Sequence, residues 1–291
     1  MTSPTLSGAT FDPSAHETEV LEWRAWRIEQ LKMPSGYLNQ IGLYWLEPGV
    51  YSFGSAASND IVISADTSPE IGIFTVGPDG VSMTVRPGVA VHSGGERVRE
   101  MIIPADTTGQ DVMVSHGSLA WTVVEREGRY AIRLRDFEHP FVKSFGPLPY
   151  FDIDPSLRVQ ATLRRYTEPR IVSVDTVIEG LGYHPESPGI VEFEIAGKTY
   201  GLEAYASGDQ LFYVFGDQTN RDATYGAGRF LYSTLPGEDG LTVLDFNKSY
   251  SPPCAFNDYS TCPVATPRNR LPIRIEAGEK FDMSFHYSPE H

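Results

Sequence analysis

The densest group of chemically capable side chains lies between residues 203 and 269, where carboxylates, hydroxyls, tyrosines and an arginine recur. Carboxylates can act as general bases, and arginine binds anionic groups through a planar fork of N–H donors. We therefore predict an enzyme or small-molecule binder whose catalytic residues are Asp217, Arg229 and Asp245. The expected ligand-binding residues around these three are Glu203, Thr219, Thr224, Tyr225, Asn247 and Tyr250.

Three expected strands, 211–215, 229–233 and 241–246, would position this group. A Pro-Gly-Glu-Asp-Gly turn joins the second to the third, so the chain forms an up-down-up meander. Pairing through that turn places Arg229 within about one residue of Asp245, close enough for a cross-strand ion pair. The competing interpretation is a structural network, because buried ion pairs often fix geometry without catalysis.

Two cysteines, Cys254 and Cys262, follow in a proline-rich loop with seven residues between them. Three interpretations stay open: two buried thiols, a disulfide, or a metal or reactive-thiol site, although zinc-binding cysteine pairs usually lie closer in sequence. The seven histidines show no metal-ligand spacing, so we expect no metal. The glycines at 226 and 228 lack the third glycine of a dinucleotide fingerprint and precede a strand, so we expect no cofactor.

The composition limits the class of protein. The 291 residues include 41% hydrophobic and 12% aromatic residues, with 27 Gly and 22 Pro, which is typical of short strands joined by turns. The net charge of −15 repels phosphate backbones, so we expect no nucleic-acid partner. No stretch approaches the ~20 apolar residues of a membrane span. The polar N-terminus and the low cysteine count favour a cytoplasmic location, and no oligomeric state is predicted.

A single long helix is expected near the N-terminus, after a flexible tail at 1–13. Ser14 and Glu17 have the spacing of a capping box, which places the helical segment at 14–36 with its last turn near Lys32. The apolar set is broad, so we expect much of this helix to be covered, with Trp23 or Trp26 packed on a β domain. That set is Val20, Leu21, Trp23, Ala25, Trp26, Ile28 and Leu31.

Beyond residue 36 the apolar residues alternate, which predicts a mainly β fold in two parts, 37–147 and a C-terminal antiparallel β-rich domain at 148–291. Pro147-Leu148-Pro149 is the expected hinge. The expected strands of the first part are 60–63, 71–76, 81–85, 119–124 and 130–135. Those of the second part are 158–164, 171–174, 190–195, 211–215, 229–233, 241–246, 271–275 and 281–286.

The segment Gly49–Ser55, followed by Asn59–Ile63, resembles the opening of a forkhead-associated domain. That resemblance implies a β-sandwich over 37–147. Ser55 stands where the family has its phosphate-reading arginine, and the later Ser-Arg-x-x-His element is absent, so no phosphothreonine binding is expected. The alternative function is a non-catalytic protein-binding or scaffold module that uses this sandwich.

Four longer motifs resemble the bacterial and archaeal family known as domain of unknown function 1684, over about Trp23 to Lys280. They are Gly42-Leu43-Tyr44-Trp45-Leu46, Thr224-Tyr225-Gly226-Ala227-Gly228-Arg229-Phe230-Leu231, the run from Leu244 to Phe256, and Asn269-Arg270-Leu271-Pro272. The family's usual Thr-Ser-Gly is Thr219-Asn220-Arg221 here, so this loop differs. The resemblance implies no particular reaction.

Overall fold

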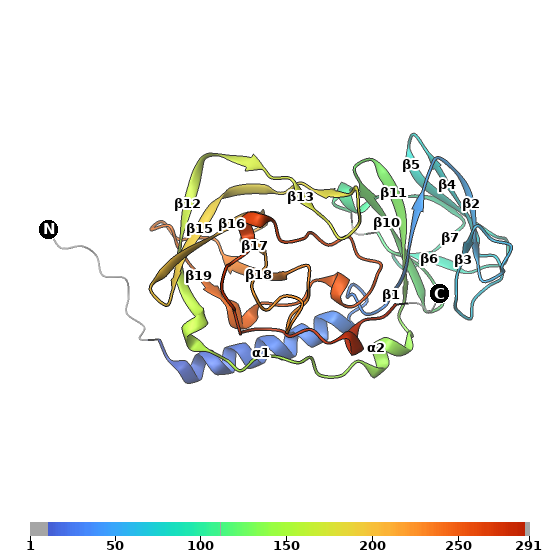
Figure 1. The fold of residues 1–291 in the computed structure, drawn as a ribbon. Coiled ribbons are helices and arrows are strands. Elements are labelled where there is room, and N and C mark those ends of the chain that lie inside the picture. The colour runs from blue at the N-terminus through green and yellow to red at the C-terminus, as the bar shows by residue number, and fades with distance from the viewer. Residues whose placement is uncertain (1–10, 111, 289–291) are drawn as a thin grey trace.

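The computed structural model describes residues 11–110 and 112–288, and within them the fold is mainly β, as predicted. One long helix, α1 (Pro13–Lys32), precedes the strands (Figure 1). The N-terminal strands are β1 (Gln40–Leu46), β2 (Gly49–Gly54), β3 (Ile61–Val62), β4 (Gly72–Gly77), β5 (Gly80–Val85), β6 (Val91–Ser93), β7 (Glu96–Val98), β8 (Glu100–Ile103), β9 (Val114–His116), β10 (Leu119–Arg126) and β11 (Arg129–Asp136). The C-terminal strands are β12 (Arg158–Ile171), β13 (Val174–Asp175), β14 (Gly182–Tyr183), β15 (Glu186–Ile195), β16 (Lys198–Ser207), β17 (Gln210–Phe215), β18 (Arg229–Thr234) and β19 (Leu241–Asp245).

Short helices occupy several of the connections. They are η1 (Asp106–Thr108), α2 (Pro140–Ser144), η2 (Pro155–Leu157), η3 (Phe246–Lys248), η4 (Pro253–Ala255), η5 (Pro267–Asn269) and η6 (Met283–Phe285).

Two N-terminal sheets share one core. The first has the order β1-β11-β10-β9-β6-β7 and the second β3-β2-β4-β5-β8, antiparallel except where β2 pairs with β3. Phe53 and Phe74 of the second sheet stack with ring centroids 4.1 Å apart, and Trp121 of the first meets both rings edge-on. All three side chains are buried, so aromatic packing joins the sheets.

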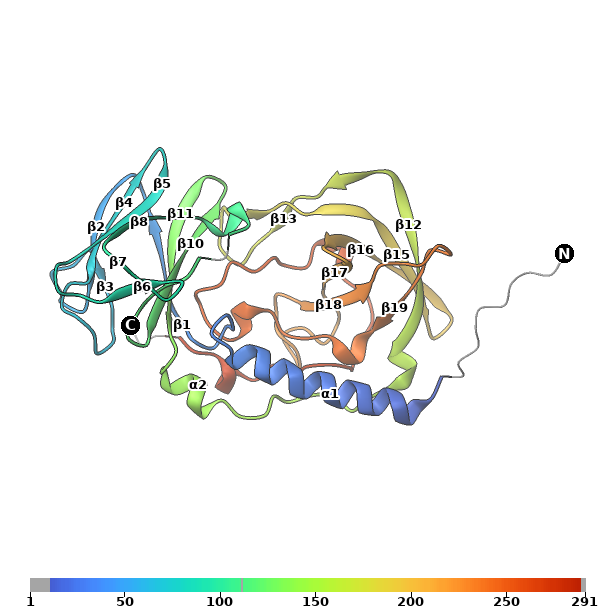
Figure 2. The same cartoon turned by 180° about the vertical axis from the view of Figure 1, so that it is seen from behind.

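The C-terminal sheet forms a nearly closed, barrel-like structure with the order β18-β17-β16-β15-β12-β19 (Figures 1 and 2). Its interior is filled by apolar side chains such as Phe193, Phe215 and Phe246. The end strands β18 and β19 meet at their shared turn, where Thr242 Oγ1 donates to the carbonyl of Thr234 at 2.9 Å. No ladder of strand hydrogen bonds joins β18 to β19 in the described residues, so a seam remains between them.

Helix α1 runs along one side of this barrel (Figures 1 and 2). Its N-cap is Asp12, whose carboxylate accepts from the backbone N–H of Ser14 at 3.0 Å, so the predicted cap at Ser14 is wrong by two residues. The buried residues of α1 form a narrow stripe: His16, Val20, Arg27 and Leu31. Leu21 and Trp26 are about half exposed, and only four of the 20 helical residues are buried, so the expectation that much of the helix is covered is also wrong.

Three predicted strands, 171–174, 271–275 and 281–286, are not strands as predicted. Residue 171 ends β12 and residue 174 begins β13, with two residues outside any strand between them. The other two differ more. Residues 271–275 form an extended segment that bonds irregularly to the loop after β17: Leu271 N–H donates to Gly216, and the Ile273 carbonyl accepts from Gln218. Pro272 has no backbone N–H, so it cannot donate a hydrogen bond to a neighbouring strand. Residues 281–286 contain η6, capped by Asp282. Of the predicted tail at 1–13, residues 1–10 lie outside the described residues, and residue 13 already begins α1. The division at residue 147 stays a prediction.

The cysteine loop packs against side chains of β16–β18 in a cluster separate from the barrel interior. Cys254 and Cys262 are both buried and unbridged, and the backbone N–H of Cys254 points at the Cys262 sulfur at 3.1 Å. Burial and the neighbouring thiol raise the pKa of Cys262 well above its usual value. These contacts fit the interpretation as two packed thiols. Within the described residues, no helix has the length and apolarity needed to cross a membrane.

Candidate functional site

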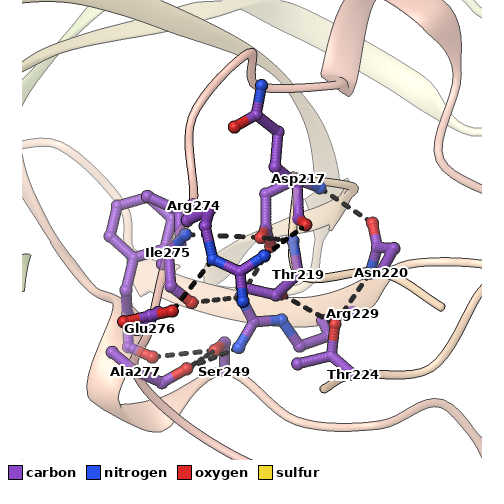
Figure 3. A network of polar contacts seen from close by, with 12 residues as sticks. Asp217, Thr219, Asn220, Thr224, Arg229, Ser249, Arg274, Ile275, Glu276 and Ala277 are labelled. Carbon is purple, nitrogen blue, oxygen red and sulfur yellow. Dashed lines mark hydrogen bonds and ion pairs between the residues drawn. The ribbon is translucent and has the colours of Figure 1, made fainter. Parts of the chain in front are cut away.

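Arg229 and Asp217 form a buried ion pair at one end of the barrel (Figure 3). Arg229 Nη2 donates to Asp217 Oδ2 at 2.7 Å and to the carbonyl of Ile275 at 2.9 Å, while Nη1 donates to the carbonyl of Ala277. Neither side chain has any exposed surface. Burial lowers the pKa of Arg229, and the charge of Asp217 opposes that shift.

Local sequence explains how the pair is placed. Gly228, just before β18, has φ of +114°, and a Cβ there would lie 2.6 Å from the carbonyl oxygen of Phe215. Only glycine tolerates this approach, which brings the start of β18 beside the end of β17. Asp217 then orders its own turn by accepting from the N–H of Thr219 at 2.7 Å. The predicted proximity of Arg229 and Asp217 is confirmed.

The predicted Arg229–Asp245 ion pair is wrong. Asp245 Oδ2 instead lies 2.8 Å from His16 Nε2 of α1, and its Oδ1 accepts from Asn247. The reason is the sheet order: β19 pairs with β12, where Asp245 lies opposite Arg158, and not with β18. Strands that are consecutive in sequence are therefore not neighbours in the ladder.

The predicted hydroxyl residues belong to the Asp217 turn. Thr219 Oγ1 and Thr224 Oγ1 lie 2.9 Å apart, and both residues are buried. Tyr225 is half-buried with its ring 5.0 Å from that of Phe281, and burial together with the nearby Cys254 raises its pKa. These residues surround the ion pair without opening it to solvent. The catalytic roles of Asp217 and Arg229 stay predictions, and a substrate has no route to either side chain in this conformation.

Glu203 lies apart from the other predicted residues, on β16. Its Oε1 accepts from Tyr166 at 2.9 Å and from Arg170 at 2.8 Å, and Oε2 is 3.8 Å from Arg268. Burial alone would raise the pKa of Glu203, but the hydrogen bonds from Arg170 and Tyr166 outweigh it and lower the pKa. Glu203 is thus held by a cationic cluster of its own.

Asn247 and Tyr250 follow β19. Asn247 is fully buried and exchanges two hydrogen bonds with the backbone of Asp154, both at 2.8 Å. Tyr250 exchanges backbone hydrogen bonds with Phe230, and its ring stacks on that of Tyr232 at 6.5 Å. Asn247 is therefore fully occupied by structural bonds, whereas Tyr250 presents a ring to the seam.

A cleft of about 380 Å³ opens along the seam between β18 and β19, and we call it the seam cleft. It contains two of the nine predicted site residues, Asp245 and Tyr250. Its lining residues are Glu19, Trp23, Arg158, Gln210, Tyr232, Ser233, Thr234, Val243, Asp245, Lys248 and Tyr250.

Each charged side chain that lines the seam cleft has a salt-bridge partner within the described residues, except Arg158. Lys248 bonds Glu19 of α1, and Asp245 is held by His16. Arg158 lies within salt-bridge distance of no carboxylate among the residues that the structure describes, and its guanidinium instead sits 5.6 Å from the ring of Phe11. The cleft therefore offers one cation whose charge is not neutralised by direct contact.

Sequence reasoning missed most of this cleft. Arg158 begins a strand and Trp23 lies on the helix, so their proximity depends on how α1 docks along the barrel. Besides the predicted Asp245 and Tyr250, the sequence signal was the aromatic side chain of Trp23 on the helix. No group of three or more potential metal ligands is found in the described part of the chain.

Comparisons with known proteins find similarity in the C-terminal half of the chain. Residues 143–280 match the family model described as "Protein of unknown function (DUF1684)". Among solved structures, the solution NMR structure of an uncharacterised protein from Haloarcula marismortui is similar. It is 29% identical, the match covers 48% of this chain and 79% of that chain, and the TM-score is 0.41. No curated protein matches.

The expected extent of the family match was too long at its N-terminal end, since the matched residues begin at 143 and not near Trp23. The resemblance of 49–63 to a forkhead-associated domain has no support from these comparisons.

The alternative function, a protein-binding module, would use a surface of the N-terminal sheets. The outer face of the second N-terminal sheet offers no continuous apolar surface. Exposed Val50 and Ile102 share a row across the sheet, but Thr75 and Ser82 separate them.

Proposed function

We propose that this protein is a small-molecule binder whose site is the seam cleft, and that its ligand carries a planar ring and a carboxylate. The observation that carries the proposal is the position of Arg158: its guanidinium, which forms no ion pair with a carboxylate in the described part of the chain, lies beside stacked tyrosines. The proposed site thus moves from Arg229, at the start of β18, to the seam between β18 and β19, with Asp245 and Tyr250 retained.

The chemistry of the walls favours such a ligand. Tyr232 and Tyr250 stack within 11° of parallel, and Trp23 lies 6.1 Å from Tyr250 between ring centroids. Flat aromatic walls accept a planar ring, and a guanidinium binds a carboxylate through two parallel N–H donors. A volume of about 380 Å³ lies near the low end of typical ligand pockets, which favours a small molecule.

The test is isothermal titration calorimetry of the full chain with three aromatic carboxylates: 4-hydroxybenzoate, nicotinate and indole-3-acetate. We expect saturable one-to-one binding of at least one of them. Arg158→Ala should weaken that binding about tenfold or more, because a charge-assisted hydrogen bond contributes roughly 1.5–3 kcal/mol.

Arg165→Ala is the matched control. Arg165 is an exposed guanidinium on the same strand, forms no ion pair among the described residues, and its removal changes the net charge equally. The Arg165→Ala variant should bind the aromatic carboxylate with the same affinity as the unmodified chain. Failure of all three compounds to bind, or equal affinity in Arg158→Ala, would contradict the proposal.

A further inference from the structure

A second cleft, of about 320 Å³, lies at one edge of the N-terminal sheets and is distinct from the seam cleft. It is formed by the end of β5, the turn that follows it, the end of β7, and Arg99, which joins β7 to β8. Its lining residues are Val85, Arg86, Pro87, Gly88, Val89, Arg97, Val98 and Arg99. Three of the eight are arginines and none is acidic, in a chain whose net charge is −15.

The three guanidiniums are incompletely neutralised. Arg86 pairs with Glu70 at 2.5 Å. Arg97 Nη2 donates to the carbonyl of Val89 at 3.2 Å, and among the described residues neither Arg97 nor Arg99 forms an ion pair. Glu96 and Glu100 line the adjoining depression together with these two arginines, but not this cleft. Arg97 and Arg99 therefore offer positive charge to an anion in this cleft, although the chain as a whole has a net charge of −15.

The backbone around the cleft is held in place. The turn 86–89 closes with a hydrogen bond from Val89 N–H to the Arg86 carbonyl at 3.2 Å. Pro87 and Gly88 occupy its central positions, and Gly88 has φ of +94°, as a type II turn requires. Across the cleft, Val85 N–H donates to the Arg99 carbonyl at 2.8 Å. A fixed rim lets the arginines meet a ligand without first ordering the loop.

We infer that this cleft binds the phosphate group of a small molecule, as free phosphate or as a phosphate ester. Phosphate is the oxyanion that several arginines suit best, since each guanidinium fork matches two of its oxygens and the doubly charged group needs more than one cation. The aromatic walls of the seam cleft are absent from this lining, so recognition here depends on charge and hydrogen bonding. The site does not depend on the proposed function of the seam cleft.

The test is isothermal titration calorimetry of the full chain with sodium pyrophosphate, with inorganic phosphate and a phosphothreonine peptide in parallel arms. We expect saturable one-to-one binding of pyrophosphate that weakens as sodium chloride is added. Arg97→Ala and Arg99→Ala should each weaken it about tenfold, and Arg97→Lys, which keeps the charge and loses the fork, should lie between. Comparable affinity for inorganic phosphate identifies free phosphate as the ligand, and weaker affinity identifies a larger phosphate compound.

The controls separate this site from general charge effects and from the seam cleft. Arg165→Ala carries the same charge change, and Arg158→Ala removes the cation of the other cleft, so both should bind pyrophosphate as the unmodified chain does. Both Arg97 and Arg99 are exposed, and their variants should keep the thermal unfolding profile. The inference is overturned if pyrophosphate binding does not saturate, or if only the phosphothreonine peptide binds. It is also overturned if Arg165→Ala weakens pyrophosphate binding as much as Arg97→Ala and Arg99→Ala do, or if neither of those two variants weakens it.

Discussion

Arg229 is a guanidinium with no exposed surface, balanced by one carboxylate and two backbone carbonyls. All of its partners come from segments far apart in sequence: the loop after β17 supplies Asp217, and the irregular segment after Pro272 supplies Ile275 and Ala277. The residue therefore ties that segment to the end of the barrel. Such a role concerns stability and geometry, and it requires no substrate.

Replacing Arg229 with Ala should lower the free energy of unfolding by about 3–5 kcal/mol, because Asp217 is left as a buried charge without its cation. Urea denaturation followed by circular dichroism measures this. The control Arg165→Ala removes an exposed arginine and should change the free energy by less than about 0.5 kcal/mol. A loss below about 1 kcal/mol for Arg229→Ala would show that the ion pair does not hold the fold.

The carboxylate of Glu203 should make the protein sensitive to acid. Its pKa is lowered in the folded state, so the stabilisation is present above the unfolded pKa of roughly 4.3 and is lost as pH falls through the folded value. Between about pH 5 and pH 3, the unmodified chain should therefore lose more unfolding free energy than Glu203→Gln does. Urea titrations at each pH measure the two slopes.

Glu194→Gln is the matched control for that comparison. Glu194 lies exposed on the neighbouring strand β15 and forms no ion pair among the residues that the structure describes. Its variant should follow the pH dependence of the unmodified chain. Parallel slopes for Glu203→Gln and the unmodified chain would contradict a lowered pKa at Glu203.

At the scale of elements, helix α1 docks through polar contacts as much as through apolar ones. His16 meets Asp245, and Arg27 donates to the Ser251 carbonyl at 3.0 Å while its Nε lies 3.6 Å from the buried Glu279. The guanidinium of Arg27 also covers the Tyr250 ring at 4.4 Å. These partners explain why the apolar pattern of the helix overstated its burial: two of its four buried residues are His and Arg.

The two tryptophans of α1 should therefore differ in their contribution to stability. Trp23 is partly buried beside Tyr250, so Trp23→Ala should cost about 2 kcal/mol, less than the ~3–5 kcal/mol of a fully buried tryptophan. Trp26 is 54% exposed, and Trp26→Ala should change stability by less than about 0.5 kcal/mol. Urea denaturation of both variants measures this, and equal losses would contradict the docking of α1.

At the scale of the whole molecule, the alternation of apolar residues and the turn-forming residues predicted those features of the fold that depend on local sequence. The helix, the mainly β class and many strand cores were predicted, because periodic burial leaves a local pattern. Strands β1, β2, β6 to β9, β14 and β16 were missed. The Arg229–Asp245 pair was misplaced because sheet order is not local: β19 closes onto β12, 70 or more residues away. The seam cleft combines α1, β12, β18 and β19, so no single stretch of sequence contains its signal.

The central claim, that the seam cleft binds an aromatic carboxylate, is tested most directly by a crystal structure of the full chain with the tightest-binding of the three compounds. The account predicts electron density for the ring against Tyr232 and Tyr250, with the carboxylate within hydrogen-bond distance of Arg158. Density for the bound compound at another place in the molecule, with the seam cleft empty, would contradict it.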